Sequence, residues 1–191
     1  MIFQHEPVLL REVLQWMNVR ANGVYCDGTL GGGGHSAALL EASGGTASLY
    51  GIDRDETAIA AASERLSAYP GFHAIRGNFH DGKVLLEEAG AGALDGVLLD
   101  LGVSSPQLDT PERGFSYHTD APLDMRMDRS GGETAADFLN TAEEREIARV
   151  IREYGEEKWA VRIAKIICER RIRKPLETTF DLVEAVDAAI P

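Results

Sequence analysis

A glycine-rich turn directly after a predicted strand is the first part of the sequence that could bind a ligand. The strand expected at residues 24–27 runs into residues 28–35, five of which are glycine. Glycines permit positive φ and remove Cβ atoms, so a nucleotide-like molecule can lie over such a turn beside the N-terminus of the next helix. A merely flexible loop is the alternative. A phosphate-binding loop would continue with Gly-Lys, whereas here Gly34 is followed by His35 and Ser36, which argues against ATP or GTP.

Two further candidates follow the second and third predicted strands. Asp53 ends the second strand, 19 residues after Gly34, where a carboxylate can accept both hydroxyls of a ribose. Asp53 could instead cap a helix that begins near Glu56. Phe79 follows the third strand and could lie against an adenine ring, or it could belong to the core. Together these positions predict a ligand that contains a nucleoside.

Asp100 ends the fourth predicted strand and is followed by short hydroxyl side chains, among them Ser104. The carboxyl ends of the strands are where open α/β sheets bind their ligands. Asp100 could oppose the positive charge of a sulfonium or accept a hydrogen bond from a substrate amine. It could also do no more than cap its loop.

The elements that must position these residues alternate between short β-prone runs and helical stretches. We expect strands at residues 24–27, 48–53, 72–76 and 97–100, preceded by a helix whose first turn contains Pro7. This alternation is typical of a parallel sheet with crossover helices. The glycine turn, Asp53 and Asp100 are therefore predicted to converge at one rim of the sheet.

The second half of the chain has a different character. Residues 101–132 are rich in Gly, Ser, Pro and Asp, and only helix signals follow. Thr134, Thr141 and Thr178 each precede an acid by three residues, an arrangement that predicts three helix starts. Gly155 interrupts and Pro175 closes a long amphipathic stretch. We expect two domains, at residues 1–108 and 109–191.

Composition limits the classes of protein to consider. The 191 residues are 44% apolar and carry a net charge of −12, which argues against a protein that coats nucleic acid by bulk electrostatics. Residues 158–174 nevertheless hold seven basic residues and one acid, which could face phosphates or form a solvated helix face. No run is long and apolar enough to span a membrane. Cys26, Cys168 and five scattered histidines match no metal spacing, so we expect a cytoplasmic protein without a bound metal.

Taken together, these segments resemble the RsmH (MraW) family of small-subunit ribosomal RNA cytosine-N4 methyltransferases. The resemblance covers nearly the whole chain. It is carried by residues 5–9 (HEPVL), 27–36 (DGTLGGGGHS), 51–55 (GIDRD), 100–109 (DLGVSSPQLD), 113–116 (RGFS), 123–127 (LDMRM) and 154–157 (YGEE).

The resemblance implies a Rossmann-like S-adenosylmethionine-dependent methyltransferase domain, interrupted after its fourth strand by an inserted helical domain that helps to bind RNA. Members of the family continue past this point with the remaining strands, so the sheet is expected to be partial. The cofactor would be S-adenosylmethionine and the partner ribosomal RNA of the small subunit. The cofactor contacts implied for this sequence are Gly33, Gly34, His35, Asp53, Phe79, Asp100 and Gln107.

The implied reaction passes a methyl group to the exocyclic amine of a cytosine. Acceptors at Asp100 and Ser104 are expected to hold the N–H groups of the amine. Methylation at ring carbon 5 would instead need a cysteine nucleophile. Arg113, Arg126 and the basic residues 158–174 are candidates for contacting RNA, although Arg126 could pair with a nearby aspartate. The rival readings are a nicotinamide-dependent oxidoreductase and a non-catalytic remnant that binds cofactor or RNA.

Overall fold

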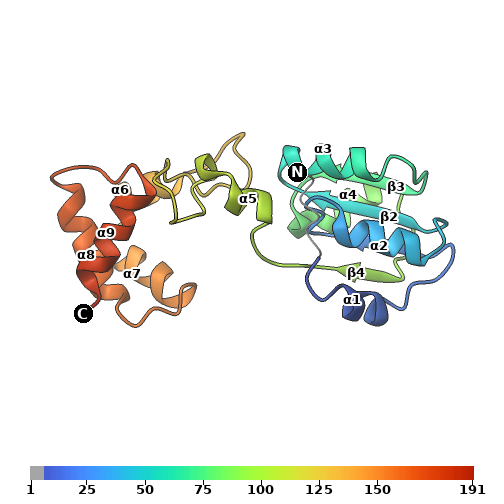
Figure 1. Cartoon of the computed structure of the whole chain (residues 1–191), viewed down its shortest axis with the longest axis horizontal. Helices are drawn as coiled ribbons and strands as arrows, with labels where there is room; N and C mark the ends of the chain where they lie inside the picture. Colours follow the sequence, from blue (N-terminus) through green and yellow to red (C-terminus); the bar gives the residue numbers. More distant parts are fainter. Residues whose placement is uncertain (1–6) are drawn as a thin grey trace. The chain divides into compact units, whose positions relative to one another are not determined.

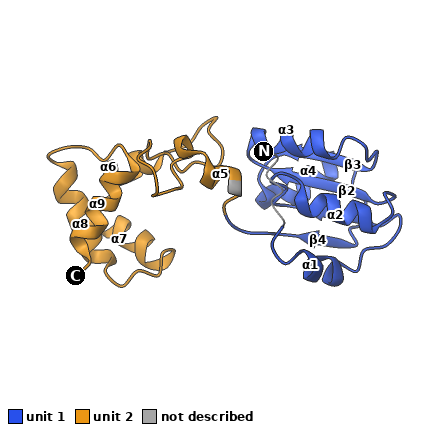
Figure 2. Cartoon of the chain, viewed as in Figure 1, with its two compact units in different colours: residues 1–102 blue, residues 103–191 orange. Residues whose placement is uncertain are grey.

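The chain forms two compact units, Met1–Gly102 and Val103–Pro191, coloured separately in Figure 2. A computed structural model describes residues 7–191, so His5 and Glu6 of the first family segment lie outside the described residues. Each unit has its own cluster of buried apolar side chains. The two units are therefore described separately.

The first unit is built on a parallel sheet, as the alternation of strands and helices predicts. In the described part of the chain its strands are β1 (Val24–Asp27), β2 (Ser48–Asp53), β3 (Phe72–Arg76) and β4 (Gly96–Leu98), in the order β3-β2-β1-β4 (Figure 1). All neighbouring pairs are parallel. The expected bounds of the first three strands are confirmed. The fourth strand ends earlier than expected, at Leu98, so Asp100 lies beyond the hydrogen-bonded ladder.

Helices cover this sheet as crossover connections between the parallel strands. They are α2 (Gly34–Ala42), α3 (Glu56–Arg65) and α4 (Gly82–Glu88), with a 3₁₀ turn η1 (Phe79–Asp81) before α4, and α1 (Leu10–Met17) precedes the first strand. Because crossovers between parallel strands are right-handed, the strand order puts α2 and α3 on one face of the sheet and α4 on the other. Tyr25 of β1, Leu49 of β2 and Leu39 of α2 are fully or almost fully buried in one cluster, which holds α2 against the sheet.

The first helix begins later than the sequence predicts. Leu9 has a left-handed backbone conformation with φ 52°, so α1 begins at Leu10 rather than at Pro7. Pro7 instead packs on the glycine turn, because a Cβ added at Gly34 would lie 2.7 Å from its Cγ. The proline thus contacts the candidate site instead of starting the helix.

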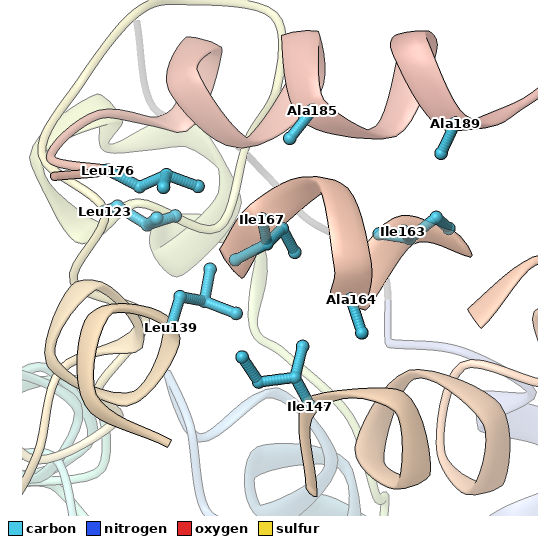
Figure 3. Close-up of a cluster of buried hydrophobic side chains, with 9 residues drawn as sticks. All are labelled: Leu123, Leu139, Ile147, Ile163, Ala164, Ile167, Leu176, Ala185 and Ala189. Carbon is cyan, nitrogen blue, oxygen red and sulfur yellow. The ribbon is translucent and has the colours of Figure 1, made fainter. Parts of the chain in front are cut away.

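The second unit is helical, as expected. Its elements are α5 (Ser105–Asp109), the 3₁₀ turn η2 (Pro111–Arg113), α6 (Ala135–Thr141), α7 (Glu144–Glu153), α8 (Ala160–Arg171) and α9 (Thr179–Ala189). Ile163 and Ile167 of α8 lie between Ile147 of α7, Leu139 of α6 and Ala185 of α9 (Figure 3). Helix α8 is therefore the centre of this core.

Two of the three predicted helix caps are confirmed. The side chains of Thr134 and Thr178 accept the N–H groups of Asp137 and Asp181 at the starts of α6 and α9. The prediction for Thr141 is wrong. Its hydroxyl donates to the carbonyl oxygen of Asp137, four residues earlier (2.8 Å), and Thr141 is the last residue of α6. Helix α7 begins at Glu144, so its N-cap position is occupied by Glu143 and not by Thr141.

Candidate functional site

The carboxyl ends of three adjacent strands bring the predicted chemical groups to one rim of the first unit. Strand β1 lies between β2 and β4, and its last residue, Asp27, pairs with Gly51 of β2 and Leu98 of β4. Asp53 ends β2, and Asp100 follows β4. The glycine turn that leaves β1 therefore lies between the two carboxylates that the sequence singled out.

The glycine turn is held by backbone bonds and needs glycine at its end. Gly33, the residue before α2, has φ +73°, and a Cβ added there would lie 3.2 Å from Cβ of Ala62 and Cδ1 of Leu66. The N–H of Leu30 donates to the carbonyl oxygen of Ile52 (3.1 Å), which ties the turn to β2. The turn is thus a shaped cradle with a defined backbone path rather than a loose connection.

Asp53 fixes this cradle with both of its carboxylate oxygens. Oδ2 accepts the N–H of Gly31 (2.8 Å) and Oδ1 accepts the N–H of Asp55 (2.9 Å). The cap of α3 is Asp55, whose side chain accepts the N–H of Thr57 (3.0 Å), so the alternative reading of Asp53 as that cap is wrong. Each oxygen of an ionised carboxylate can accept more than one hydrogen bond, which leaves Asp53 able to receive ribose hydroxyls.

His35 is a buried side chain with unused hydrogen-bonding capacity. It is 8% exposed, and neither ring nitrogen has a hydrogen-bond partner within residues 7–191. Its Nε2 lies 3.4 Å from Oδ2 of Asp100, whose side chain is half exposed. Buried polar atoms are nearly always satisfied in proteins, so these nitrogens fit a bound group that brings its own donors or acceptors. The cradle, Asp53 and His35 together suit an adenosyl ligand such as S-adenosylmethionine.

Behind the cradle lies Asp27, a carboxylate that is almost fully buried. Its Oδ2 accepts the hydroxyl of Ser36 (2.7 Å), and its Oδ1 accepts the N–H of Thr29 (3.1 Å) and, more weakly, the hydroxyl of Thr29 (3.5 Å). Burial raises the pKa of Asp27, and the hydrogen bonds from Ser36 and Thr29 oppose that rise. Asp27 thereby joins the end of β1 to the first turn of α2.

Phe79 lies beside the glycine turn and is not part of the core. A Cβ added at Gly28 would meet Cδ2 of Leu99 at 2.6 Å and Cβ of Phe79 at 3.2 Å, so both side chains pack over that glycine. Phe79 remains 44% exposed. An aromatic ring at this position offers a surface on which a flat base can stack.

The remaining predicted site residues belong to the second unit and have contacts within it. Gln107 is buried, and its Oε1 accepts the N–H of Ser104 (3.0 Å) at the start of α5. Arg113 is 8% exposed, and it donates to the carbonyl oxygens of Arg126 (3.0 Å) and Met127 (2.8 Å). These bonds organise the segment between α5 and α6.

Arg126 makes a two-pronged ion pair with the buried carboxylate of Asp124. Its Nε lies 2.7 Å from Oδ1 and its second terminal nitrogen 2.9 Å from Oδ2. Arg129 adds a longer contact to Oδ2 (3.4 Å). The hydrogen bond from Arg126 holds the pKa of Asp124 below its usual value, although partial burial opposes this. Of the two sequence interpretations of Arg126, the structure shows the pairing with an aspartate.

The basic segment of residues 158–174 is partly engaged in internal contacts. Arg170 pairs with Glu184 (3.1 Å), Lys174 with Asp181 (2.9 Å), and Arg171 donates to the carbonyl oxygens of Leu139 and Ala142. Within residues 7–191, Arg162 and Arg173 have no ion-pair partner. These two cations are available for phosphate groups.

The thiols are poorly suited to nucleophilic chemistry. Burial, and secondarily the charge of Asp27, raise the pKa of Cys26 to about 11, and burial also raises the pKa of Cys168. Since the thiolate is the reactive form, neither cysteine is activated for attack on a base.

Comparison with known proteins assigns this architecture to a family. The profile of the MraW methylase family matches residues 2–191. The chain belongs to the MraW methylase family. Ribosomal RNA small subunit methyltransferase H of Heliobacterium modesticaldum is 52% identical over 193 residues, covering 100% of this chain and 62% of that protein. The protein of that name from Symbiobacterium thermophilum is 53% identical over 192 residues, covering 100% and 60%. This MraW-family chain thus spans about 60% of the length of these relatives.

Membership of the MraW family excludes the nicotinamide-dependent oxidoreductase as a reading of the glycine turn and Asp53. Among solved structures, an rRNA methylase from Streptococcus thermophilus aligns with 53% of this chain and 58% of that chain, with a TM-score of 0.40 and 20% identity. Within residues 7–191, no helix combines the length and apolar content needed to cross a bilayer.

Sequence reasoning gave no role to Thr29, which contributes to this site. The N–H of Asp100 donates to the Thr29 hydroxyl oxygen (2.7 Å) across 71 positions of sequence. The sequence does contain a signal, because Thr29 stands two residues after Asp27, which ends a strand. This spacing is typical of a turn in which the aspartate side chain accepts the backbone N–H of the residue two positions later.

Proposed function

We propose that this chain carries the cofactor-binding part of a methyltransferase that modifies the N4 amine of a cytosine in small-subunit ribosomal RNA, with S-adenosylmethionine as the methyl donor. The observation that carries the proposal is the convergence of the glycine turn, Asp53 and Asp100 on one rim of a parallel sheet in a chain that belongs to the MraW methylase family. The relatives are named as ribosomal RNA small subunit methyltransferases, which supports RNA as the substrate.

Each residue of the rim has a proposed task in holding the cofactor. Asp53 accepts the ribose hydroxyls, Phe79 lies against the adenine, and the turn at Gly33 and Gly34 lets the backbone approach the ligand closely. His35, whose ring nitrogens have no hydrogen-bond partner in the described residues, and Asp100 are the other residues of the first unit that we propose to contact the cofactor. The family resemblance adds Gln107 as a further residue that we propose to contact the cofactor.

When bound, S-adenosylmethionine supplies a methyl group that is activated for attack by a nucleophile. The exocyclic nitrogen of cytosine is a weak nucleophile because its lone pair is delocalised into the ring, so the protein must position it. Asp100 is a carboxylate at the rim that can accept an N–H of this amine and take up the proton that it releases. The hydroxyl of Ser104 is the second acceptor that we propose.

The RNA must present its base to this rim as a splayed-out nucleotide, since a paired base hides its exocyclic amine. We propose that the predicted domain at residues 109–191, which lies within the second unit, supplies the contacts to RNA. Arg162 and Arg173 are the strongest candidates, while Arg113 and Arg126 support RNA binding by ordering the segment between α5 and α6.

Calorimetry and methyl transfer test this proposal. Saturable binding of S-adenosylmethionine to the 191-residue chain, without binding of NAD, is the expected result. The second measurement is incorporation of tritiated methyl groups into undermodified small ribosomal subunits, with the Heliobacterium modesticaldum relative as the positive control. If the chain binds no S-adenosylmethionine, the proposal is wrong. If it binds the cofactor but only the longer relative transfers methyl groups, this chain is a cofactor-binding part without turnover.

A further inference from the structure

The loop that carries Asp100 is anchored by a side chain rather than by the sheet. The ladder between β1 and β4 ends at the pair Asp27 and Leu98, and the N–H of Gly28 donates to the carbonyl oxygen of Leu98 (2.9 Å). Past that point, the N–H of Asp100 finds its acceptor in the hydroxyl oxygen of Thr29 (2.7 Å). This bond thus continues the connection between β1 and β4 beyond the last strand pair.

The Thr29 hydroxyl connects Asp100 to the buried end of β1. A hydroxyl has one donor and two acceptor positions, so the Thr29 oxygen can accept from Asp100 while its hydrogen points toward Oδ1 of Asp27 (3.5 Å). The carboxylate of Asp27 is 1% exposed and is also fixed by Ser36 of α2. A chain of bonds therefore runs from a rigid point inside the unit to the backbone of a residue whose own side chain is half exposed.

We propose that Thr29 is a positioning residue that holds the Asp100 carboxylate at the rim in the orientation needed to bind S-adenosylmethionine. This inference rests on the proposed function. Without the Thr29 acceptor, the N–H of Asp100 would turn to water, and the carboxylate would sample more orientations before a ligand arrives. Binding would then include the cost of ordering it, which weakens affinity without removing any direct contact.

Substitutions at Thr29 separate the hydroxyl from the shape of the side chain. Thr29→Val keeps the branched shape and removes the acceptor, whereas Thr29→Ser keeps the hydroxyl. We expect Thr29→Val to weaken binding of S-adenosylmethionine roughly three- to tenfold, the range for one neutral hydrogen bond, and Thr29→Ser to restore most of it. Affinity is measured by calorimetry on the 191-residue chain.

A matched control is available at the other end of the sheet. The Thr46 hydroxyl also accepts a backbone N–H, that of Asn22 (2.9 Å), and donates to the carbonyl oxygen of Ser43 (2.8 Å). It lies in the connection between α2 and β2, away from the rim. Thr46→Val is therefore expected to lower the melting temperature about as much as Thr29→Val does. The affinity for S-adenosylmethionine should stay unchanged.

A double-mutant cycle distinguishes positioning of Asp100 from a general loosening of the turn. If Thr29 acts through Asp100, Thr29→Val has no further effect on affinity in an Asp100→Ala background, although its effect on melting temperature persists. An equal loss of affinity in both backgrounds would overturn the inference, as would wild-type affinity in Thr29→Val. Absence of cofactor binding by the unmodified chain would instead refute the proposed function.

Discussion

Oδ2 of Asp53 accepts the N–H of Gly31 at 2.8 Å, so the carboxylate at the end of β2 holds the glycine turn that leaves β1. Asp53→Asn removes the charge and leaves one oxygen for two backbone N–H groups. Loss of a charged acceptor costs about 1.5–3 kcal/mol, so we expect S-adenosylmethionine to bind at least about tenfold more weakly in calorimetry.

Asp95→Asn is the control for this change. Oδ2 of Asp95 accepts the N–H of Val24 (2.9 Å) at the opposite end of β1. Asp95→Asn should lower stability without altering cofactor affinity. Equal effects of the two substitutions on affinity would show that Asp53 acts on the fold alone.

Gly33 and Gly44 share a left-handed backbone but differ in the space around them. Their φ angles are +73° and +68°, yet a Cβ at Gly33 would lie 3.2 Å from Cβ of Ala62, while nothing lies within 4 Å of a Cβ at Gly44. We expect Gly44→Ala to lower the free energy of unfolding by about 1 kcal/mol and Gly33→Ala by about 2–3 kcal/mol. Chemical denaturation measures both values.

The same pair of variants tests the cradle. Only Gly33→Ala should also reduce binding of S-adenosylmethionine, because a displaced turn can no longer bring its backbone close to the ligand. Unchanged affinity in Gly33→Ala would mean that the turn is not a binding surface.

Asp27 should give stability a pH dependence opposite in sign to that of most carboxylates. Burial raises its pKa in the folded state above the usual 3.8, so the folded chain holds the proton more tightly than the unfolded chain. Its contribution to stability is therefore complete at pH values below 3.8 and is lost as the pH rises through the raised pKa. Asp27→Asn removes this titration and keeps an oxygen for Thr29.

Denaturant unfolding of the wild type and of Asp27→Asn across pH 3–8 measures this contribution. The other carboxylates contribute equally to the free energy of unfolding of both proteins, so their contributions cancel in the difference. Relative to the wild type, Asp27→Asn should become more stable as the pH rises. If the difference in free energy of unfolding between the two proteins does not change with pH, burial does not raise the pKa of Asp27.

The sequence predicts the sheet well because its signals are local. The strands at residues 24–27, 48–53 and 72–76 are short apolar runs, each followed by turn-prone residues, and their bounds are confirmed. The bond from Asp100 to Thr29 could not be predicted, since it depends on which strands are neighbours and on a contact across 71 positions. The cap predicted at Thr141 is wrong because a threonine hydroxyl can bond to the helix behind it as well as to the helix ahead, and the spacing to the next acid does not distinguish the two.

Asp124 and Arg126 should be strongly coupled in stability. Asp124 is 6% exposed, so Arg126→Ala leaves a mostly buried carboxylate with the longer contact to Arg129 (3.4 Å) and the backbone N–H of residue 126 (3.0 Å). We expect Arg126→Ala to lower the free energy of unfolding, and a double-mutant cycle with Asp124→Ala should give a coupling energy clearly different from zero. Thermal or denaturant unfolding provides the values. A stable Arg126→Ala with weaker RNA binding would instead identify Arg126 as a direct RNA contact.

Arg162 should contact RNA phosphates, because it is a cation of the basic segment with no ion-pair partner in the described residues. Arg162→Gln is expected to weaken binding of a single-stranded ribosomal RNA fragment in fluorescence anisotropy. Each phosphate contact on a single strand contributes about 0.7 to the slope of log affinity against log salt, so the slope should fall by roughly that amount. The effect should be similar across RNA sequences, because phosphate contacts carry no base information.

Arg149→Gln provides the matched control, since it changes the net charge equally. The Arg149 guanidinium is already held by Glu146 (2.7 Å) and Glu153 (2.6 Å) on α7. Its replacement should leave the salt slope unchanged if local contacts matter. Equal losses in Arg162→Gln and Arg149→Gln would mean that RNA responds only to net charge, and an unchanged slope in Arg162→Gln would place the RNA on another surface. The comparison therefore decides whether α8 carries a phosphate contact in a chain whose net charge of −12 repels RNA as a whole.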